Sequence, residues 1–404
     1  MSAETINGAR IVLETLHRLG VTDMFGYPGG AVIPIYDEIY SFPEIKHYFV
    51  RHEQGAAHAA DGYARVSGKV GVCLATSGPG ATNLVTGIMT AYMDSVPMVA
   101  ITGQVGRPFI GKDSFQEADI QGITMPITKH NYLVQDIRDL PRIIKEAYFI
   151  ASTGRPGPVL IDIPKDVQTE KISMTEYNKL YEVPIHLEGY DPTYKGHQGQ
   201  IKKAATLIKN AKRPLIIAGA GVLKSGAMDE LKELAEKAQI PVTNTLVGLG
   251  GFPGNHELAL GMVGMHGSVA ANNSTEEADL VIAAGIRFHD RITGHPDFFC
   301  KKAKIIHIDI DPAEIDKNVT INVPIVGDLK RVLSELNTLV EPTTHEAWIG
   351  QIREWQAEYP MVIPESKDGV LHPQYVLSEL NKIAKEDAVI VTDVGQHQMW
   401  AAQF

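Results

Sequence analysis

Glu53 is the residue from which the chemistry of this chain can be reasoned. It stands in Arg51-His52-Glu53-Gln54-Gly55-Ala56, between an apolar run at 47–50 and a stretch rich in Gly and Ala. The run predicts a short buried strand, and the stretch predicts a helix so slim that a partner helix or a flat cofactor ring can approach it. A glutamate in a first helical turn can have no role beyond a favourable interaction with the helix dipole. The other motifs must decide between that role and a chemical one.

Two hydrolytic mechanisms are disfavoured by spacing. His52 and His58 flank Glu53 but are six residues apart, about 600° of helical rotation, so they face different ways and do not form a zinc site. Ser77 stands in Ser77-Gly78-Pro79-Gly80, which is not the Gly-x-Ser-x-Gly elbow of a hydrolase nucleophile.

A nucleotide-like cofactor is indicated in the second half of the chain. Gly219-Ala220-Gly221 follows an apolar run, as in a dinucleotide-binding turn, but Gly226 is wrongly spaced for Gly-x-Gly-x-x-Gly, and a tight turn explains the pair equally well. Two further runs end in Arg287-Phe288-His289-Asp290-Arg291 and in Asp309-Ile310-Asp311. Arginine suits a diphosphate and an acid suits a ribose hydroxyl. Capping or surface pairing explains each residue singly, whereas their convergence at strand ends favours the cofactor.

Composition narrows the class of protein. The chain has 404 residues, 44% of them apolar, and a net charge of −11 without a basic cluster, which disfavours nucleic acid and anionic membranes as partners. Only Cys73 and Cys300 are present, with no disulfide or metal-ligand spacing, as suits a reducing cytoplasm. No apolar run is long enough to span a membrane. The N-terminal apolar residues repeat at helical spacing, so we expect an amphipathic helix and not a signal peptide.

The elements that must position these residues follow an α/β pattern. Strands are predicted at 24–27, 47–50, 70–75, 98–102 and 158–163, and several are continuous apolar runs typical of parallel sheets covered on both faces. Gly-rich loops follow their carboxyl ends, where open α/β sheets bind ligands. A second set of strands is predicted at 214–218, 241–243, 280–284 and 304–310, with helices at 199–209, 226–238 and 329–339. We therefore expect successive three-layer, doubly wound domains with parallel sheets.

The last part of the chain is expected to begin a third domain. A helix at 373–385, a strand at 388–391 and a helix from 396 are predicted before Phe404. One strand and two helices cannot build a sheet core. The third domain therefore reads as cut off, either because the sequence is a fragment or because the chain is a truncated form.

Many segments, taken in order, resemble one family. They are Phe25-Gly26-Tyr27-Pro28-Gly29-Gly30-Ala31, Arg51-His52-Glu53-Gln54-Gly55-Ala56, Thr76-Ser77-Gly78-Pro79-Gly80-Ala81-Thr82-Asn83, Gly103-Gln104-Val105, Ser114-Phe115-Gln116-Glu117, Gly154-Arg155-Pro156-Gly157, Gly264-Met265-His266-Gly267, Arg287-Phe288-His289-Asp290-Arg291 and Val394-Gly395-Gln396-His397. Together they resemble the large catalytic subunit of acetohydroxyacid synthase (acetolactate synthase), a thiamine-diphosphate enzyme. The resemblance runs from near residue 5 to residue 404.

The resemblance implies a domain plan and three cofactors: thiamine diphosphate, FAD and Mg²⁺. It implies a pyrimidine-binding domain at 1–170, a linker at 171–195, an FAD-binding domain at 196–342, a linker at 343–370 and the start of the diphosphate-binding domain at 371–404. The family's magnesium ligands would lie beyond residue 404, so no metal ligand is assigned within this chain.

The resemblance also assigns thiamine-diphosphate and substrate roles. Glu53 would hydrogen-bond the aminopyrimidine N1′ and favour the imino tautomer, whose 4′-nitrogen takes the thiazolium proton. Glyoxylate carboligases lack this acid, so its presence favours the synthase. Gly30, Gln116 and Lys165 would join Glu53 as catalytic residues, and Phe115, Gln116 and Arg291 would contact substrate, since a guanidinium grips a planar carboxylate. A structural ion pair is the alternative for Arg291. The remaining cofactor contacts implied are Ala31, Thr76, Pro79, Asn83, Gly395, Gln396 and His397.

The FAD contacts that the resemblance implies fall mostly in the central domain. They are Arg155, Gly219, Gly221, Thr245, Leu246, Met265, His266, Gly285, Arg287, Asp309 and Asp328. His289 departs from the family, which usually has Asp there, so one flavin contact is in doubt. The flavin would be structural, because the carboligation is not a redox reaction.

The resulting functional hypothesis is a transferase of branched-chain amino-acid biosynthesis. It would join two pyruvates to 2-acetolactate, or pyruvate and 2-oxobutyrate to 2-aceto-2-hydroxybutyrate, with loss of carbon dioxide. A homodimer or homotetramer with the active site between subunits is implied, and a small regulatory subunit is an expected partner. Two alternatives stay open: a pyruvate oxidase-like flavoenzyme, and an inactive fragment that binds flavin or another subunit.

Overall fold

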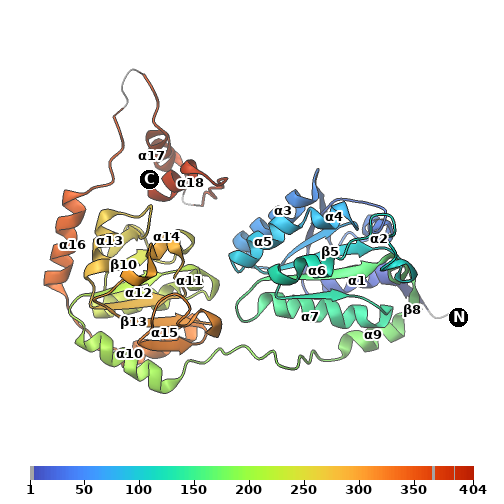
Figure 1. The fold of residues 1–404 in the computed structure, drawn as a ribbon, viewed down its shortest axis with the longest axis horizontal. Helices are drawn as coiled ribbons and strands as arrows, with labels where there is room; N and C mark the ends of the chain where they lie inside the picture. Colours follow the sequence, from blue (N-terminus) through green and yellow to red (C-terminus); the bar gives the residue numbers. More distant parts are fainter. Residues whose placement is uncertain (1–3, 366–368, 386) are drawn as a thin grey trace. The chain divides into compact units, whose positions relative to one another are not determined.

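The computed structural model describes residues 4–365, 369–385 and 387–404. The chain divides into two compact units, Met1–Pro192 and Thr193–Phe404, coloured blue to green and green to red in Figure 1. Each unit is an α/β domain built on a six-stranded parallel sheet, which confirms the predicted fold class. No helix within the described ranges is both long enough and apolar enough to cross a membrane.

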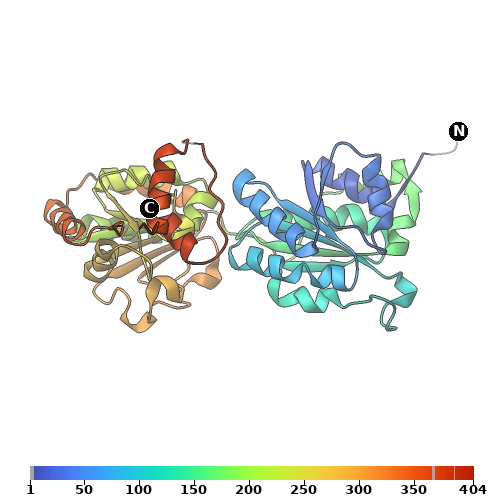
Figure 2. The same ribbon diagram turned by 90° about the horizontal axis from the view of Figure 1, so that it is seen from above.

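The sheet of the first unit has the strand order β3-β2-β4-β5-β7-β6. Its strands are β2 (Asp23–Gly26), β3 (Lys46–Phe49), β4 (Gly71–Ala75), β5 (Met98–Gln104), β6 (His130–Leu133) and β7 (Pro158–Pro164). Helices cover both faces (Figure 2). Side chains alternate along a strand, so Val72 and Leu74 of β4 pack with helices α1 (Gly8–Arg18), α2 (Ile33–Tyr40) and α7 (Leu140–Ser152). Cys73 and Ala75 face α3 (Glu53–Ser67) and α5 (Val85–Met93) instead.

The strand at 47–50 is not buried as predicted. It becomes β3, which has a neighbour on one side only because it lies at the edge of the sheet. Its side chains remain largely open to solvent, and Phe49 is 63% exposed. The other edge strand, β6, was not predicted because His130-Asn131-Tyr132-Leu133 lacks a continuous apolar run.

The expected linker at 171–195 is partly folded. Its first residues form β8 (Lys171–Ser173), which pairs antiparallel with β1 (Thr5–Asn7), and α9 (Met174–Glu182). Tyr177 of α9 is fully buried against the first core. Only the later part of this stretch, 183–195, is without helix or strand in the described structure.

The sheet of the second unit has the order β11-β10-β9-β12-β13-β14. Its strands are β9 (Pro214–Ala218), β10 (Val242–Asn244), β11 (Ala259–Met262), β12 (Leu280–Ala284), β13 (Lys304–Asp309) and β14 (Val323–Val326). One face is covered by α10 (Gln198–Asn210), α12 (Met228–Ala238) and α15 (Leu329–Leu339). The opposite face is covered by α13 (Val269–Glu277) and α16 (Glu346–Glu358).

The stretch at 343–370, expected to be a linker, contains the helix α16. Trp348, Ile352 and Trp355 recur at helical spacing and form an apolar stripe that packs on the sheet. Trp348 is 4% exposed and donates its indole N–H to the Pro214 carbonyl over 3.0 Å. Residues 366–368 of the same expected linker lie outside the described residues.

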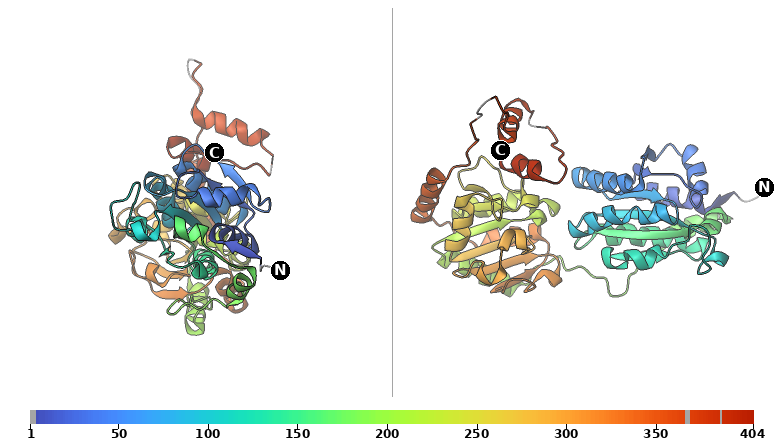
Figure 3. Two further views of the ribbon diagram at one scale, coloured as in Figure 1. Left: turned by 90° about the vertical axis from the view of Figure 1, so that its right-hand side faces the viewer. Right: turned by 45° about the horizontal axis from the view of Figure 1, so that its top comes forward.

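The C-terminal part contains two short helices, α17 (Pro373–Ile383) and α18 (Gln396–Gln403), which pack against each other (Figure 3). The strand predicted at 388–391 is wrong. Val389 and Val391 are 65% and 86% exposed, and no neighbouring strand pairs with them in the described structure. An apolar run becomes a strand only where another strand accepts its backbone hydrogen bonds. Residue 386, within the expected domain at 371–404, is outside the described residues.

Candidate active site

Glu53 and Asn83 meet at the carboxyl end of the first sheet. Helix α3 begins at Glu53, because the ring of His52 accepts the Gln54 amide over 3.1 Å and caps the helix. Asn83 ends the short helix α4 (Pro79–Thr82) and donates its side-chain amide to Glu53 Oε2 over 2.9 Å. The structure therefore gives the half-buried Glu53 carboxylate a defined orientation, which a helix-dipole role alone would not require.

Two glycine-rich loops meet around the side chain of Thr76. The Thr76 hydroxyl accepts the Ala31 amide over 3.0 Å. A Cβ on Gly29 would lie 2.4 Å from Thr76 Cγ2, and a Cβ on Gly80 would lie 2.6 Å from the same atom and 3.4 Å from Glu53 Oε1. Any larger residue would fill the space beside the Glu53 carboxylate. The loops at 27–31 and 76–83 thus form one cradle, as the sequence predicts.

Gln168 supports this cradle from beneath and was missed by sequence reasoning. Its side-chain amide donates to the carbonyls of Ala31 and Ile163, each over 2.8 Å, and the residue is fully buried. Its Oε1 has no protein partner in the described structure. Gln168 belongs to the short helix α8 (Lys165–Thr169), and no pattern in the sequence around it could have pointed to this role.

Gln116 lies against the same cradle in a left-handed backbone conformation. Its φ is +59°, which is uncommon for a residue other than glycine. A Cβ on Gly78 would lie 2.7 Å from the Gln116 carbonyl oxygen, so the loop that carries Gln116 closely approaches the loop at 76–80. Phe115, next to it, is 87% exposed. Strained backbone of this kind costs about 1–3 kcal/mol and is concentrated at functional sites.

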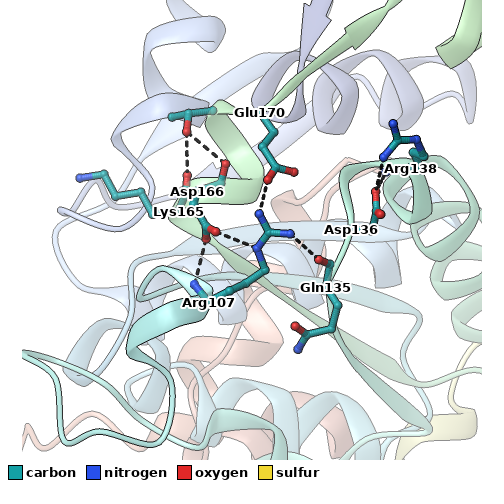
Figure 4. A network of polar contacts seen from close by, with 8 residues as sticks. Arg107, Gln135, Asp136, Arg138, Lys165, Asp166 and Glu170 are labelled. Carbon is teal, nitrogen blue, oxygen red and sulfur yellow. Dashed lines mark hydrogen bonds and ion pairs between the residues drawn. The ribbon is translucent and has the colours of Figure 1, made fainter.

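Two more of the predicted residues, Gly30 and Lys165, lie at the same edge of the sheet. Gly30 is exposed, and a Cβ at this position would meet nothing within 4 Å. Lys165 is the first residue of α8 directly after β7, and Figure 4 shows its amine pointing away from the neighbouring polar network. Arg155, by contrast, precedes β7 and lies at the opposite edge, where it donates to the Ser95 hydroxyl over 2.8 Å. The carboxyl ends of β2, β4, β5 and β7 therefore supply one site, as expected for an open parallel sheet.

Two buried titratable groups lie behind this edge. Asp162 of β7 accepts from the Thr102 hydroxyl over 2.7 Å and from the Gln104 side chain over 2.9 Å. Burial raises the pKa of Asp162 to about 7, although these hydrogen bonds act in the opposite direction. Burial also raises the pKa of Tyr36, and the nearby charge of Glu53 adds to the effect. Neither residue was predicted, because burial of a single polar side chain leaves no local pattern.

In the second unit the predicted glycines converge at the ends of β9, β10 and β12. A Cβ on Gly219 would lie 2.3 Å from the Gly285 carbonyl oxygen, and one on Gly221 would lie 2.6 Å from Gly285 Cα. Thr245, which follows β10, donates its amide to the Ala218 carbonyl over 2.9 Å. The Thr245 hydroxyl is buried and has no protein partner in the described structure. This combination of close-packed backbone and an unsatisfied hydroxyl fits a bound ligand.

Other predicted residues lie near these strand ends or serve a structural role. Leu246 opens a 3₁₀ turn, and Arg287 follows β12. Asp309 ends β13 and accepts the Asp311 amide over 2.9 Å. Asp328 caps α15 by accepting the Arg331 amide over 3.1 Å. Helix capping is the alternative to a cofactor contact that the sequence also allows for a single acid.

Arg291 lines a separate cavity of about 300 Å³ with Met265, Gly264 and neighbours from α13. The Met265 amide donates to the Arg291 carbonyl over 2.9 Å, and the Arg291 side chain is 64% exposed beside Asp290. The carbonyl of His266 accepts from Gln403 of α18 over 2.8 Å. Gly395 precedes α18, and Gln396 and His397 form its first turn.

Comparison with known proteins decides the family. Residues 6–123 match the model of the thiamine pyrophosphate enzyme N-terminal TPP binding domain, and residues 201–336 match that of the central domain. An acetolactate synthase of Arthrospira platensis is 52% identical over 423 residues, covering 100% of this chain and 71% of that protein. The chain belongs to the acetolactate synthase family of thiamine pyrophosphate enzymes. Large subunits from Mycobacterium tuberculosis and Corynebacterium glutamicum are 51% and 50% identical over 410 and 406 residues, covering 100% and 99% of this chain.

The matched domains of the acetolactate synthase family contain the two sites described above. The matched N-terminal domain is of a type that binds thiamine diphosphate. It contains the Thr76 cradle, Glu53, Asn83 and Gln116. The matched central domain contains the glycines around Gly285. The chain spans 66% and 64% of the lengths of the Mycobacterium tuberculosis and Corynebacterium glutamicum relatives.

Proposed function

We propose that this chain acts in the thiamine-diphosphate-dependent carboligation of two pyruvates to 2-acetolactate, or of pyruvate and 2-oxobutyrate to 2-aceto-2-hydroxybutyrate. These reactions release carbon dioxide and belong to branched-chain amino-acid biosynthesis. The observation that carries the proposal is the Glu53–Asn83 hydrogen bond beside the space that Gly80 leaves open. That space and the oriented carboxylate fit a flat heteroaromatic ring with a protonated nitrogen.

The residues of the first unit would then have distinct tasks. Bound thiamine diphosphate supplies the nucleophilic carbon that attacks the 2-oxoacid. Glu53 holds a proton at the aminopyrimidine ring nitrogen, and Asn83 keeps the Glu53 carboxylate turned toward it. Ala31, Thr76 and Pro79 line the ring. Gly30 lies by the reacting oxygen.

Further side chains would contact the second 2-oxoacid and the intermediates. Gln116 would hydrogen-bond the reacting groups, Phe115 would line the channel, and Lys165 would supply positive charge at its entrance. Arg291 would bind the substrate carboxylate with two parallel hydrogen bonds. Gly395, Gln396 and His397 would contact the diphosphate, whose charge Mg²⁺ would balance. We further propose a cytoplasmic homodimer or homotetramer that works with a small regulatory subunit.

Activity with pyruvate, thiamine diphosphate, Mg²⁺ and FAD tests the proposal directly. Glu53→Gln should lower acetolactate formation by about 100-fold or more, because proton transfer by a positioned side chain contributes that much. Glu44→Gln, at an exposed site before β3, is the matched control and should stay fully active. Normal turnover by Glu53→Gln would refute the role of Glu53. Oxygen uptake with pyruvate would favour an oxidase instead.

FAD is proposed as the ligand of the second unit. The buried Thr245 hydroxyl and the close approach of Gly219, Gly221 and Gly285 support this proposal. Arg155, Leu246, Met265, His266, Arg287, Asp309 and Asp328 are the further residues proposed to contact it. His289 stands where the family usually has Asp, so its contact would be a hydrogen bond from imidazole.

The flavin can be tested by its absorbance in purified protein. Gly285 has a φ of +61° and Gly226 has a φ of +63°, but only a Cβ on Gly285 would collide with backbone, 2.6 Å from Gly221 Cα. Gly285→Ala should therefore lose bound flavin, whereas Gly226→Ala, with equal backbone strain, should retain it. Loss of flavin in both variants, or in neither, would contradict the assignment of this site.

A further inference from the structure

Arg107 is the centre of a polar network (Figure 4). It also lies at the start of the loop that carries Phe115 and Gln116. Its backbone amide donates to Asp166 Oδ1 over 3.0 Å, and its Nε donates to Asp166 Oδ2 over 2.7 Å. Its Nη1 donates to the Gln135 carbonyl over 2.7 Å, and its Nη2 donates to the Glu170 carboxylate. Every branch of the guanidinium thus binds a different acceptor, which lysine cannot do.

These contacts join three segments that are distant in sequence. Arg107 begins the 3₁₀ turn Arg107–Phe109 directly after β5. Asp166 and Glu170 belong to α8 and its C-cap, 59 and 63 residues later, and Gln135 follows β6. Arg107 therefore ties the start of the Gln116 loop to the helix that begins with Lys165.

The rest of the loop is joined by hydrogen bonds within the loop itself. The Glu117 carboxylate accepts the backbone amides of Gly111 and Ser114, the latter over 3.0 Å. The Ser114 hydroxyl donates to the Phe109 carbonyl over 2.9 Å. At its far end, the Gln104 side chain donates to the Ala118 carbonyl over 2.9 Å. Several of these hydrogen bonds are exposed to solvent, so they stay formed only while the base of the loop is fastened to the rest of the unit.

The same network pairs the two acidic side chains that follow Lys165 in the sequence with Arg107. Asp166 is the direct neighbour of Lys165, and both Asp166 and Glu170 are engaged by Arg107. The structure shows no ion pair between the Lys165 amine and an acid of the described ranges, and the amine points away from the two acids (Figure 4). Without Arg107, two carboxylates within one short helix would be released to attract the lysine.

We propose that Arg107 is a positioning residue of the active site. It clamps the loop at 105–117 to α8, so that Gln116 and Phe115 keep one placement relative to Lys165, and it occupies the acids that would otherwise neutralise Lys165. The roles of Gln116, Phe115 and Lys165 in this inference rest on the proposed carboligase function. The clamp itself rests only on the contacts of Arg107.

Hydrogen–deuterium exchange of the chain tests the clamp without any activity. In Arg107→Met, amides of residues 109–117 should exchange about ten-fold faster or more, the change expected for losing charge-assisted hydrogen bonds. Exchange in β4 should stay unchanged. Arg138→Met is the matched control, since Arg138 also bridges two acids, Asp136 and Glu176, in the same unit. Unchanged exchange at 109–117 in Arg107→Met would overturn the clamp.

Kinetics of the active enzyme test the charge role. Arg107→Met should raise KM for pyruvate about ten-fold, by the same energetic reasoning, and Arg107→Lys should lie between it and the native protein. Adding Asp166→Asn and Glu170→Gln to Arg107→Met should bring KM back toward the native value, while the loop still exchanges fast. A purely structural Arg107 predicts that these extra substitutions give no recovery, and that outcome would overturn the charge role.

The two tests separate the inference from the proposed function. If native protein forms no acetolactate, the carboligase proposal fails, yet the exchange experiment still decides whether Arg107 clamps the loop. If native protein is active and Arg107→Met keeps native KM and native loop exchange, the inference alone fails.

Discussion

Asn83 donates a hydrogen bond of 2.9 Å to Glu53, although the two residues are 30 positions apart. The contact exists because β3 and β4 lie on either side of β2 in a parallel sheet, so the loops that follow them leave the same edge close together. It turns the Glu53 carboxylate toward the space beside Gly80. The orientation of the proposed proton-holding group thus depends on an amide from a different loop.

Asn83→Asp should strongly impair thiamine diphosphate binding. The substitution replaces a donor by a carboxylate next to Glu53, and like charges at hydrogen-bond distance repel each other in a partly buried site. The concentration of thiamine diphosphate that half-saturates activity should rise about ten-fold or more. Asn178→Asp is the control, because it makes the same change at an exposed position beside Arg18. Equal saturation in the two variants would show that Asn83 does not orient Glu53.

Gly80→Ala should lower cofactor affinity with a smaller effect on the fold. The added methyl would lie 2.6 Å from Thr76 Cγ2 and 3.4 Å from Glu53 Oε1, so it enters the proposed ring site. Quenching of protein fluorescence by added thiamine diphosphate measures the loss. Gly350→Ala, in α16 with nothing within 4 Å, should leave cofactor binding unchanged. It should also raise stability by up to about 1 kcal/mol, since alanine favours helix more than glycine.

Gln168→Leu should destabilise the first unit by about 2–4 kcal/mol, because two carbonyls that it serves would lose their donor in the interior. The buried thiol of Cys73 in β4 reports on this unit, whereas Cys300 reports on the other. Labelling of Cys73 should begin at a lower urea concentration in the variant. Gln121→Leu is the control, because the Gln121 side chain makes only a 3.5 Å contact to the Asn131 carbonyl in the described structure. Identical urea midpoints for the two variants would contradict the proposed support of Ala31.

Asp162 should make the stability of the first unit fall as pH rises. Its pKa is about 7 when folded and near 3.8 when exposed, so the unfolded chain releases the proton first. The stabilising contribution of Asp162 to the free energy of unfolding is therefore fully present below about pH 4 and decreases between about pH 4 and pH 7. It does not change further above about pH 7. Urea midpoints from Cys73 labelling should decline over this range. Asp162→Asn should flatten the decline, whereas Asp37→Asn, at an exposed site, should not. Equal slopes for Asp162→Asn and the native protein between about pH 4 and pH 7 would refute the assignment.

Continuous apolar runs were the reliable signal for the fold. The strands Pro214–Ala218 and Leu280–Ala284 and the helix Leu329–Leu339 have the predicted bounds. The two strands are fully buried, so their apolar runs are unbroken, and the helix has apolar residues at helical spacing because one of its faces packs on the sheet. Edge strands such as β3 and β6 are half exposed and carry mixed residues. The burial of β3 was predicted wrongly and β6 was not predicted, because a strand at the edge of a sheet has fewer neighbours and can form with fewer apolar residues.

The motifs at the strand ends were a sound guide to the first site. Thr76, Asn83 and Glu53 come together as expected, since carboxyl ends of parallel strands share an edge. Gln168, Asp162 and Arg107 were missed. Each acts through a partner far away in the chain, such as Ala31, 137 residues from Gln168. Single polar residues carry no period, so local patterns cannot reveal their partners.

The sequence by itself determined the α/β class, the apolar strands and the loops that hold Glu53 and its neighbours, because these depend on residue type and spacing along the chain. Tertiary structure alone decided that Asn83 orients Glu53, that Gln168 supports Ala31 and that Arg107 binds α8. The physical reason is the strand order β3-β2-β4-β5-β7-β6, which is not sequential. It sets which loops become neighbours, and only neighbours can exchange hydrogen bonds and charge.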